Sequence, residues 1–239
     1  MSTLASRVQA NLDHVNGRIS AAARAVSRDP HDITLVAVSK TFGADAVAAA
    51  AAAGQRRFGE NYVQEAIGKI RVLRAQSLPG ALEWHFIGPI QSNKTRDIAE
   101  HFDWVHSIDR VKIAERLSAQ RPASLPPLRV LLQVNVSGEA SKSGVEPPAV
   151  AALARAVSAL PRLQLRGLMA IPEPADDPLR QRAPFAALRR LLNDLRGELG
   201  PAAAHWDTLS MGMSGDLEAA IAEGATLVRI GTAIFGARS

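Results

Sequence analysis

The sequence contains no cysteine among its 239 residues. Without thiols the chain forms no disulfide, no iron–sulfur cluster, no thiolate zinc site and no cysteine nucleophile. Six histidines are present, but none belongs to an H-x-E-x-x-H pattern or to a similar ligand spacing. The sequence therefore predicts no metal site.

Long apolar runs are also missing. No stretch of 18 uncharged apolar residues exists, and the alanine-rich run at 46–53 is too short to span a bilayer. The first 20 residues have no apolar core of the kind that marks a secretory signal. We therefore expect a soluble cytoplasmic protein that does not interact with membranes.

Aromatic residues and lysines are scarce. The chain has ten aromatic residues, and only five of its 28 basic residues are lysines. The net charge of +5 raises the hypothesis of a nucleic-acid-binding protein, but no block of five like charges and no aromatic-rich basic motif supports it. We interpret the positive charge as an arginine-rich solvated surface and predict no nucleic-acid partner. A steep salt dependence of binding to DNA would support the nucleic-acid hypothesis instead.

Strands and helices are predicted to alternate along almost the whole chain. Apolar residues at three- and four-residue steps over 4–26 indicate an amphipathic N-terminal helix that ends near residue 29. Short apolar runs then predict strands, and a helix follows each of the first seven. The eight strands are expected at 33–39, 56–61, 82–88, 104–109, 128–136, 163–171, 205–212 and 226–236.

Strict alternation of this kind predicts an α/β protein with a single (β/α)₈ barrel. The alternative is an open doubly wound sheet, but the segment after the first strand, SKTFGAD, lacks the G-x-G-x-x-G pattern of such folds. We expect one domain over 1–239, with the N-terminal helix at 1–29 and the barrel at 31–236. No helix is expected after strand eight, so the N-terminal helix would cover that gap. The segment 172–184 is predicted to be irregular.

The site of such a barrel lies at the carboxyl ends of its strands. Lys40 ends the first strand, where partial desolvation favours a neutral amine that forms Schiff bases with aldehydes. A surface lysine paired with a carboxylate explains the same position equally well. His85 is expected at the barrel mouth as a structural histidine. Lys94 and Lys142 follow strands three and five, where either solvation or transient anion binding explains them.

Two turns near the end of the chain resemble a phosphate cradle. Ser214 is expected to cap the next helix, and Gly212 and Gly215 would let backbone N–H groups approach an anion. Gly231 and Thr232 form a second small turn after strand eight. Simple helix capping and tight strand packing are the alternative explanations.

Arg229 lies within the apolar run LVRIG and needs an acceptor for its guanidinium group. That acceptor is either a carboxylate or a ring nitrogen of a heteroaromatic ligand. A lysine at a strand end, a phosphate cradle and an inward-facing arginine together describe a site for pyridoxal phosphate.

The sequence resembles the pyridoxal phosphate homeostasis protein family over residues 33–238. The motifs that carry the resemblance are LVAVSKTF, FGENYVQEAIGKI, WHFIGPIQSNK, NVSGEASKSG, GLMAI and LSMGMSGDLEAAIAEGATLVRIGTAIFGAR. The resemblance implies the barrel of the alanine racemase N-terminal domain and pyridoxal 5′-phosphate as a covalent aldimine on Lys40. The other cofactor-binding residues that it implies are Asn61, Ser214, Arg229, Gly231 and Thr232.

We expect a carrier rather than an enzyme. By resemblance, racemases take a second base, a tyrosine, from a C-terminal β-domain, whereas this chain ends after the barrel and has one tyrosine, Tyr62. Arg229 on the pyridine nitrogen would also leave the ring unprotonated and weaken it as an electron sink. The prediction is a monomeric protein of pyridoxal phosphate homeostasis with no catalytic residues, which supplies apo-enzymes. The alternative is an amino-acid racemase of low or specialised activity.

Overall fold

The computed structural model describes residues 3–76, 78, 80–137 and 143–237. Eight parallel strands pair in sequence order, and β8 returns to pair with β1, so the sheet closes into a barrel. This closure confirms the predicted (β/α)₈ barrel and excludes the open sheet. The strands are β1 (Thr34–Val38), β2 (Arg57–Glu60), β3 (Glu83–Phe86), β4 (Trp104–Ile108), β5 (Leu128–Gln133), β6 (Leu163–Met169), β7 (Thr208–Ser210) and β8 (Leu227–Ile230).

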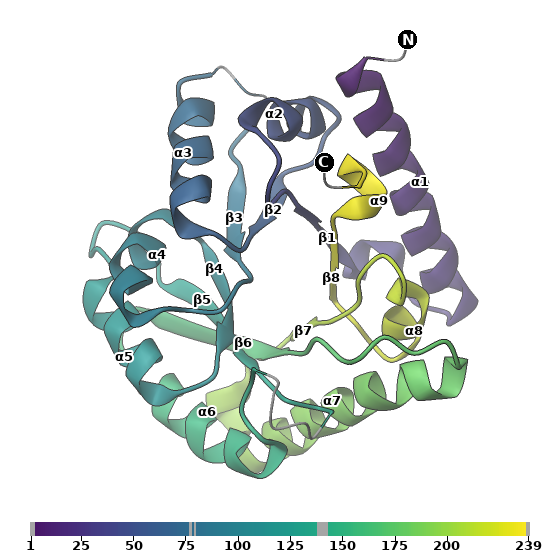
Figure 1. The fold of residues 1–239 in the computed structure, drawn as a ribbon. Helices are drawn as coiled ribbons and strands as arrows, with labels where there is room; N and C mark the ends of the chain where they lie inside the picture. The colour runs from purple at the N-terminus through teal and green to yellow at the C-terminus, as the bar shows by residue number, and fades with distance from the viewer. Residues whose placement is uncertain (1–2, 77, 79, 138–142, 238–239) are drawn as a thin grey trace.

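Helices surround the barrel, as the view along its axis shows (Figure 1). They are α1 (Leu4–Ala25), α2 (Ala44–Ala52), α3 (Val63–Arg74), α4 (Thr95–His101), α5 (Val111–Gln120), α6 (Val150–Ser158), α7 (Pro178–Leu199), α8 (Leu217–Ala222) and α9 (Thr232–Phe235). Short 3₁₀ turns occupy Pro30–Asp32, Ser92–Lys94, Pro147–Ala149 and Gly200–Ala203. None of the described helices is long and apolar enough to cross a membrane.

The N-terminal helix α1 lies on the side of the barrel where β1 and β8, the first and last strands of the sheet, pair. Its apolar stripe is buried and consists of Val8, Leu12, Val15, Ile19 and Ala23. It packs against α2, α8 and α9 (Figure 1), and the side chain of Asn11 donates to the carbonyl of Ile234 at 2.8 Å. The expectation that this helix covers the barrel beside strand eight is confirmed.

Most predicted boundaries differ from the observed ones by a few residues, and two differ by more. Strand eight was expected over 226–236 with no helix after it, but β8 ends at Ile230 and the one-turn helix α9 follows it. Gly231 turns the chain out of the strand, with φ −115° and ψ −74°. The segment 172–184 is irregular only up to Asp177, whose side chain caps α7 by accepting from the N–H of Arg180 at 2.8 Å. Pro178 then occupies the first turn, where proline is well tolerated.

Candidate binding site at the carboxyl end of the barrel

A cavity of about 280 Å³ lies at the carboxyl ends of the strands. It brings together all six residues that the sequence predicts for the site. These are Lys40, Asn61, Ser214, Arg229, Gly231 and Thr232. Gly215, which the sequence placed in the phosphate cradle, also lines the cavity, whereas Gly212 does not. The rest of the lining consists of apolar and glycine residues that the sequence did not single out, namely Val38, Phe42, Ile87, Ile171, Met213 and Gly236.

Lys40 lies two residues beyond the end of β1, and hydrogen bonds fix the backbone on both sides of it. The hydroxyl of Ser39 donates to Glu60 Oε1 at 2.6 Å, and the N–H of Thr41 donates to Glu65 Oε1 at 2.7 Å. Thr41 has φ +69°, a left-handed conformation that is unfavourable for a β-branched residue. The neighbouring contacts therefore hold a strained turn that presents Lys40 to the cavity.

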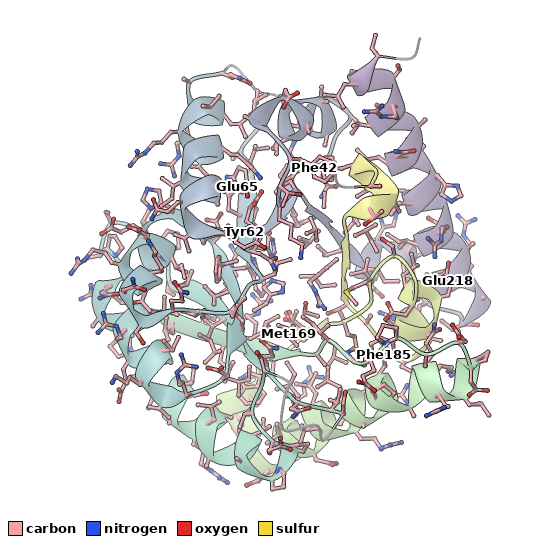
Figure 2. The ribbon with its side chains drawn as sticks, viewed as in Figure 1. Phe42, Tyr62, Glu65, Met169, Phe185 and Glu218 are labelled. Carbon is pink, nitrogen blue, oxygen red and sulfur yellow. The ribbon has the colours of Figure 1, made fainter. Side chains whose placement is uncertain are left out.

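These contacts come from one charge cluster, which we call the Lys40 support cluster and which consists of the buried Glu60 and Lys69 and the partly exposed Glu65. Lys69 Nζ lies 2.7 Å from Glu60 Oε1 and 2.5 Å from Glu65 Oε1, and it also donates to the carbonyl of Ser39 at 2.7 Å. Glu60 and Lys69 are 0% and 5% exposed. Burial raises the pKa of Glu60, and the charge and hydrogen bond of Lys69 oppose that rise. Lys69 is therefore the cation that allows Glu60 to be ionised there. Figure 2 labels Glu65 and Tyr62 near the start of α3.

Arg229 is buried at the floor of the cavity, and neutral acceptors hold it. Its Nη1 donates to Ser210 Oγ at 2.6 Å, and its Nη2 donates to the carbonyl of Ala170 at 3.0 Å. No carboxylate among the described residues forms an ion pair with it. Burial lowers the pKa of Arg229 to about 10, although the charge of Asp216 acts to raise it. The guanidinium thus stays protonated at neutral pH, without a paired anion.

The turn that carries Ser214 differs from the prediction. Ser214 was expected to cap the following helix, but α8 begins at Leu217 with Asp216 before it. Asp216 Oδ1 accepts from the N–H of Met213 at 2.5 Å, so Asp216 closes the turn. The reason is geometric, because a tight turn over 213–216 places the serine two residues too early to cap the helix. Ser214 lines the cavity instead.

Asn61 is held by a close backbone contact and has one orphaned atom. A Cβ on Gly88 would lie 2.5 Å from the carbonyl oxygen of Asn61, so only glycine permits this approach. Asn61 Oδ1 is buried and has no hydrogen-bond partner among the described residues. A buried acceptor without a donor costs free energy. This atom is therefore suited to accept a hydrogen bond from a ligand in the cavity.

Other candidate residues lie elsewhere. His85 was expected at the barrel mouth, but it lies inside the barrel near the amino ends of the strands, because it pairs with Trp104, the first residue of β4. It is hydrogen-bonded on both ring nitrogens, as the structural interpretation requires. Tyr62 is 57% exposed and does not line the cavity. Lys94 lies outside the lining, and Lys142 lies outside the described residues.

This barrel and site define a class of protein. The alanine racemase N-terminal domain family matches residues 10–239. The chain is 63% identical to the pyridoxal phosphate homeostasis protein of Pseudomonas aeruginosa, over 100% of this chain and 97% of that relative. It is 58% identical to the protein of the same name from Escherichia coli K12, over 95% of each chain. The chain therefore belongs to the pyridoxal phosphate homeostasis protein family.

Solved structures agree with this assignment. PipY from Synechococcus elongatus PCC7942, whose structure contains pyridoxal phosphate, is 37% identical, with a TM-score of 0.82 over 96% of this chain and 100% of that one. A protein of unknown function from Bifidobacterium adolescentis is 35% identical, with a TM-score of 0.87 over 97% of this chain and 96% of that one. Alanine racemase from Corynebacterium glutamicum is 18% identical, with a TM-score of 0.66 over 93% of this chain and 60% of that one, so it shares the fold alone.

Proposed function

We propose that this protein binds pyridoxal 5′-phosphate in the cavity at the carboxyl end of the barrel and acts in the homeostasis of that cofactor. One observation carries the proposal: six residues expected from the sequence, on four separate segments, line a single cavity. The orphaned Oδ1 of Asn61 and the unpaired charge of Arg229 suit a polar heteroaromatic ligand. The names of the family relatives and the ligand of PipY support the same ligand here.

Each residue has a role in this proposal. The Lys40 amine would form a covalent link with the aldehyde of the ligand, and Arg229 would donate to its ring nitrogen. Ser214, Gly231 and Thr232 would hold its phosphate through hydroxyl and backbone donors. When bound, the group supplies an aldehyde that condenses with amines and a conjugated ring that withdraws electrons.

The cavity is better suited to a carrier than to a racemase. A two-base racemase needs a base on each face of the substrate α-carbon, and Lys40 and Arg229 are the ionisable residues among the described lining. Tyr62 is exposed and lies outside that lining. A guanidinium that donates to the ring nitrogen leaves that nitrogen unprotonated and weakens the ring as an electron sink. Racemisation of low or specialised activity is the alternative that these features disfavour.

The carrier function is tested by two assays run side by side. We expect slow or no loss of the α-proton signal from a panel of L-amino acids in D₂O, because a missing base typically costs about 10²–10⁴-fold in rate. We also expect release of the cofactor to an apo-transaminase, measured by recovery of its activity. Lys40→Ala is the control for both assays. Rapid exchange that disappears in Lys40→Ala, without transfer, would favour the racemase.

The phosphate cradle makes a second prediction. Ser214→Ala and Thr232→Ala should each raise the dissociation constant for pyridoxal phosphate about ten- to a hundredfold, since a hydrogen bond to a charged group is worth roughly 1.5–3 kcal/mol. Ser158→Ala, at an exposed position of α6, is the matched control and should have no effect. Equilibrium titration monitored by absorbance provides the measurement. Pyridoxal without its phosphate should bind poorly to the unmodified protein, and equal affinity for both forms would contradict the cradle.

Other parts of the function stay predictions from the sequence. We propose apo-enzymes that use pyridoxal phosphate as recipients, a monomeric state and a cytoplasmic location. The division of the chain into a helix over 1–29 and a barrel over 31–236 within one domain is a prediction of the same kind.

A further inference from the structure

A line of buried polar side chains runs through the barrel behind Arg229. Arg229 Nη1 donates to Ser210 Oγ at 2.6 Å, and Ser210 Oγ lies 2.9 Å from His106 Nδ1. His106 Nε2 lies 2.9 Å from His85 Nδ1, and His85 Nε2 lies 3.0 Å from Glu83 Oε1. The first four of these residues are at most 4% exposed. We call this line the axial chain.

The axial chain joins two cavities at opposite ends of the barrel. Arg229 lines the cavity at the carboxyl ends of the strands. Glu83 and His85 line a second cavity of about 480 Å³ at the amino ends. There, Glu83 also accepts from Arg57 at 3.2 Å and from Arg129 at 2.7 Å. One end of the chain thus lies at the proposed ligand, and the other lies at a partly exposed group of charges.

The chemistry of its two ends, together with neutral histidine rings, fixes the direction of every hydrogen bond in the axial chain. A guanidinium only donates, and an ionised carboxylate only accepts. Burial acts to raise the pKa of Glu83, but the hydrogen bonds from His85 and Arg129 and the charge of Arg129 lower it, so that the pKa lies below its usual value and the carboxylate is ionised at neutral pH. With both rings neutral, the proton that His85 Nε2 donates to Glu83 leaves Nδ1 of His85 as an acceptor, so each histidine carries its proton on Nε2 and Ser210 donates to His106 Nδ1.

An additional proton does not fit in the axial chain. Burial lowers the pKa of His85, and burial, to which the charge of Arg229 adds, lowers the pKa of His106 well below its usual value. A charged His106 would place a second donor against Ser210 Oγ, whose own hydrogen would then have no acceptor among the described residues. The unsatisfied hydroxyl would be that of Ser210, which accepts the hydrogen bond from Arg229.

We propose that Ser210, His106 and His85 are positioning residues that hold Arg229 toward the ligand, and that the axial chain makes the ligand cavity sensitive to Glu83 at the opposite end of the barrel. The groups that face that end of the chain are Arg57 and Arg129, which bind Glu83, and the Trp104 ring, which stacks on His85 with centroids 5.5 Å apart. Arg166 and Asp207 pair beside them. This inference rests on the proposed function, because pyridoxal phosphate is the ligand whose affinity reports it.

The first test needs no ligand. In protein labelled with ¹⁵N in its histidine rings, NMR at neutral pH should show both His85 and His106 as neutral rings protonated on Nε2, with assignments from His85→Gln and His106→Gln. A proton on Nδ1 of His106, or a charged ring, would overturn the axial chain. Because this measurement uses the unmodified protein, it decides the question even if a variant does not fold or if pyridoxal phosphate does not bind.

The second test is a double-mutant cycle read by the dissociation constant for pyridoxal phosphate. Substitutions along a network that couples two sites typically change the coupling free energy by an amount that corresponds to about twofold to thirtyfold in affinity. Glu83→Gln should therefore weaken the binding of pyridoxal phosphate within that range. In the Ser210→Ala background, which cuts the chain by removing one oxygen, the effect of Glu83→Gln should fall below about twofold. Asp207→Asn, at the same end of the barrel but outside the chain, is the matched control and should leave affinity unchanged.

The outcomes of this cycle separate the two proposals. An equal effect of Glu83→Gln in both backgrounds, or no effect in the unmodified protein, overturns the axial coupling while pyridoxal phosphate binding stands. Failure of the unmodified protein to bind pyridoxal phosphate overturns the proposed function instead, and the ring protonation states then decide the axial chain alone.

Discussion

Replacing Lys69 with methionine is expected to lower the free energy of unfolding by about 3–5 kcal/mol, because removing one partner of a buried ion pair leaves the other charge uncompensated. Lys69 holds Glu60, which is 0% exposed, and reaches the backbone at Ser39 beside Lys40. For a chain of this length the loss corresponds to a fall in Tm of about 6–20 °C. Thermal and urea unfolding followed by circular dichroism provide the measurement. Lys112→Met, at an exposed position of α5, is the matched control, with an expected change within about 0.5 kcal/mol.

The loss of stability in Lys69→Met should also depend on pH. The pKa of Glu60 is raised in the folded protein by burial, and without Lys69 it should rise further. A group whose pKa is higher in the folded state than in the unfolded state stabilises the fold at low pH, and that stability is lost as the pH rises through the folded-state pKa. The deficit of Lys69→Met relative to the unmodified protein should therefore be larger at pH 8 than at pH 5. A deficit that grows on acidification would contradict this account of the Lys40 support cluster.

Replacing Lys40 with alanine is expected to abolish covalent retention of pyridoxal phosphate. The unmodified protein, after loading, should be yellow, and borohydride should fix the cofactor to the chain. Lys40→Ala should lose both properties, because no other lysine lines the described cavity. The fold should persist, since the side chain lies in the turn after β1 rather than in the core. Absorbance spectra before and after gel filtration provide the measurement.

The control for Lys40→Ala is Lys94→Ala, which removes a lysine from the turn before α4, outside the cavity lining. That variant should stay yellow and should keep its borohydride-fixed cofactor. Lys40→Ala that remained yellow, with the cofactor fixed elsewhere on the chain, would show that the covalent link has been assigned to the wrong residue.

The barrel was predictable because its signals are local. Strands buried on both faces are nearly continuous apolar runs, and amphipathic helices are indicated by apolar residues that recur at three- and four-residue steps. The end of strand eight was not predictable, since 226–236 is mostly apolar and a short apolar run does not distinguish a strand from a buried helical turn. The actual boundary depends on the backbone of Gly231, which the sequence pattern does not show.

Lys40 and the turns after strands seven and eight were predictable from their positions at strand ends, and Asn61 from the family resemblance, but the groups that support them were not. Lys69 and Glu65 are four residues apart on α3, a spacing that indicates an ion pair, yet only the fold shows that the pair contacts the turn of Lys40. His106 and Ser210 are 104 residues apart in the sequence, and only closure of the barrel brings them together. Ser214 was mistaken for a helix cap because two capping residue types, serine and aspartate, lie within three positions there.

His85 shows how a strand boundary changes a functional interpretation. The expected strand at 82–88 and the observed β3, Glu83–Phe86, differ by only a few residues. In a barrel that difference decides whether a side chain lies at the mouth or deep in the interior, because each residue advances the chain by about 3.3 Å. The burial of His85 is enough to support a structural role, whereas its place in the axial chain depends on the neighbouring strand that carries His106.

The most direct test of the central claim is to find the residue that carries the cofactor. The unmodified protein is loaded with pyridoxal phosphate, reduced with borohydride and digested, and the modified peptide is identified by mass spectrometry. The account predicts a single reduced adduct on Lys40, in the peptide that follows β1. An adduct on Lys69, Lys94, Lys112 or Lys142 with Lys40 unmodified would contradict it.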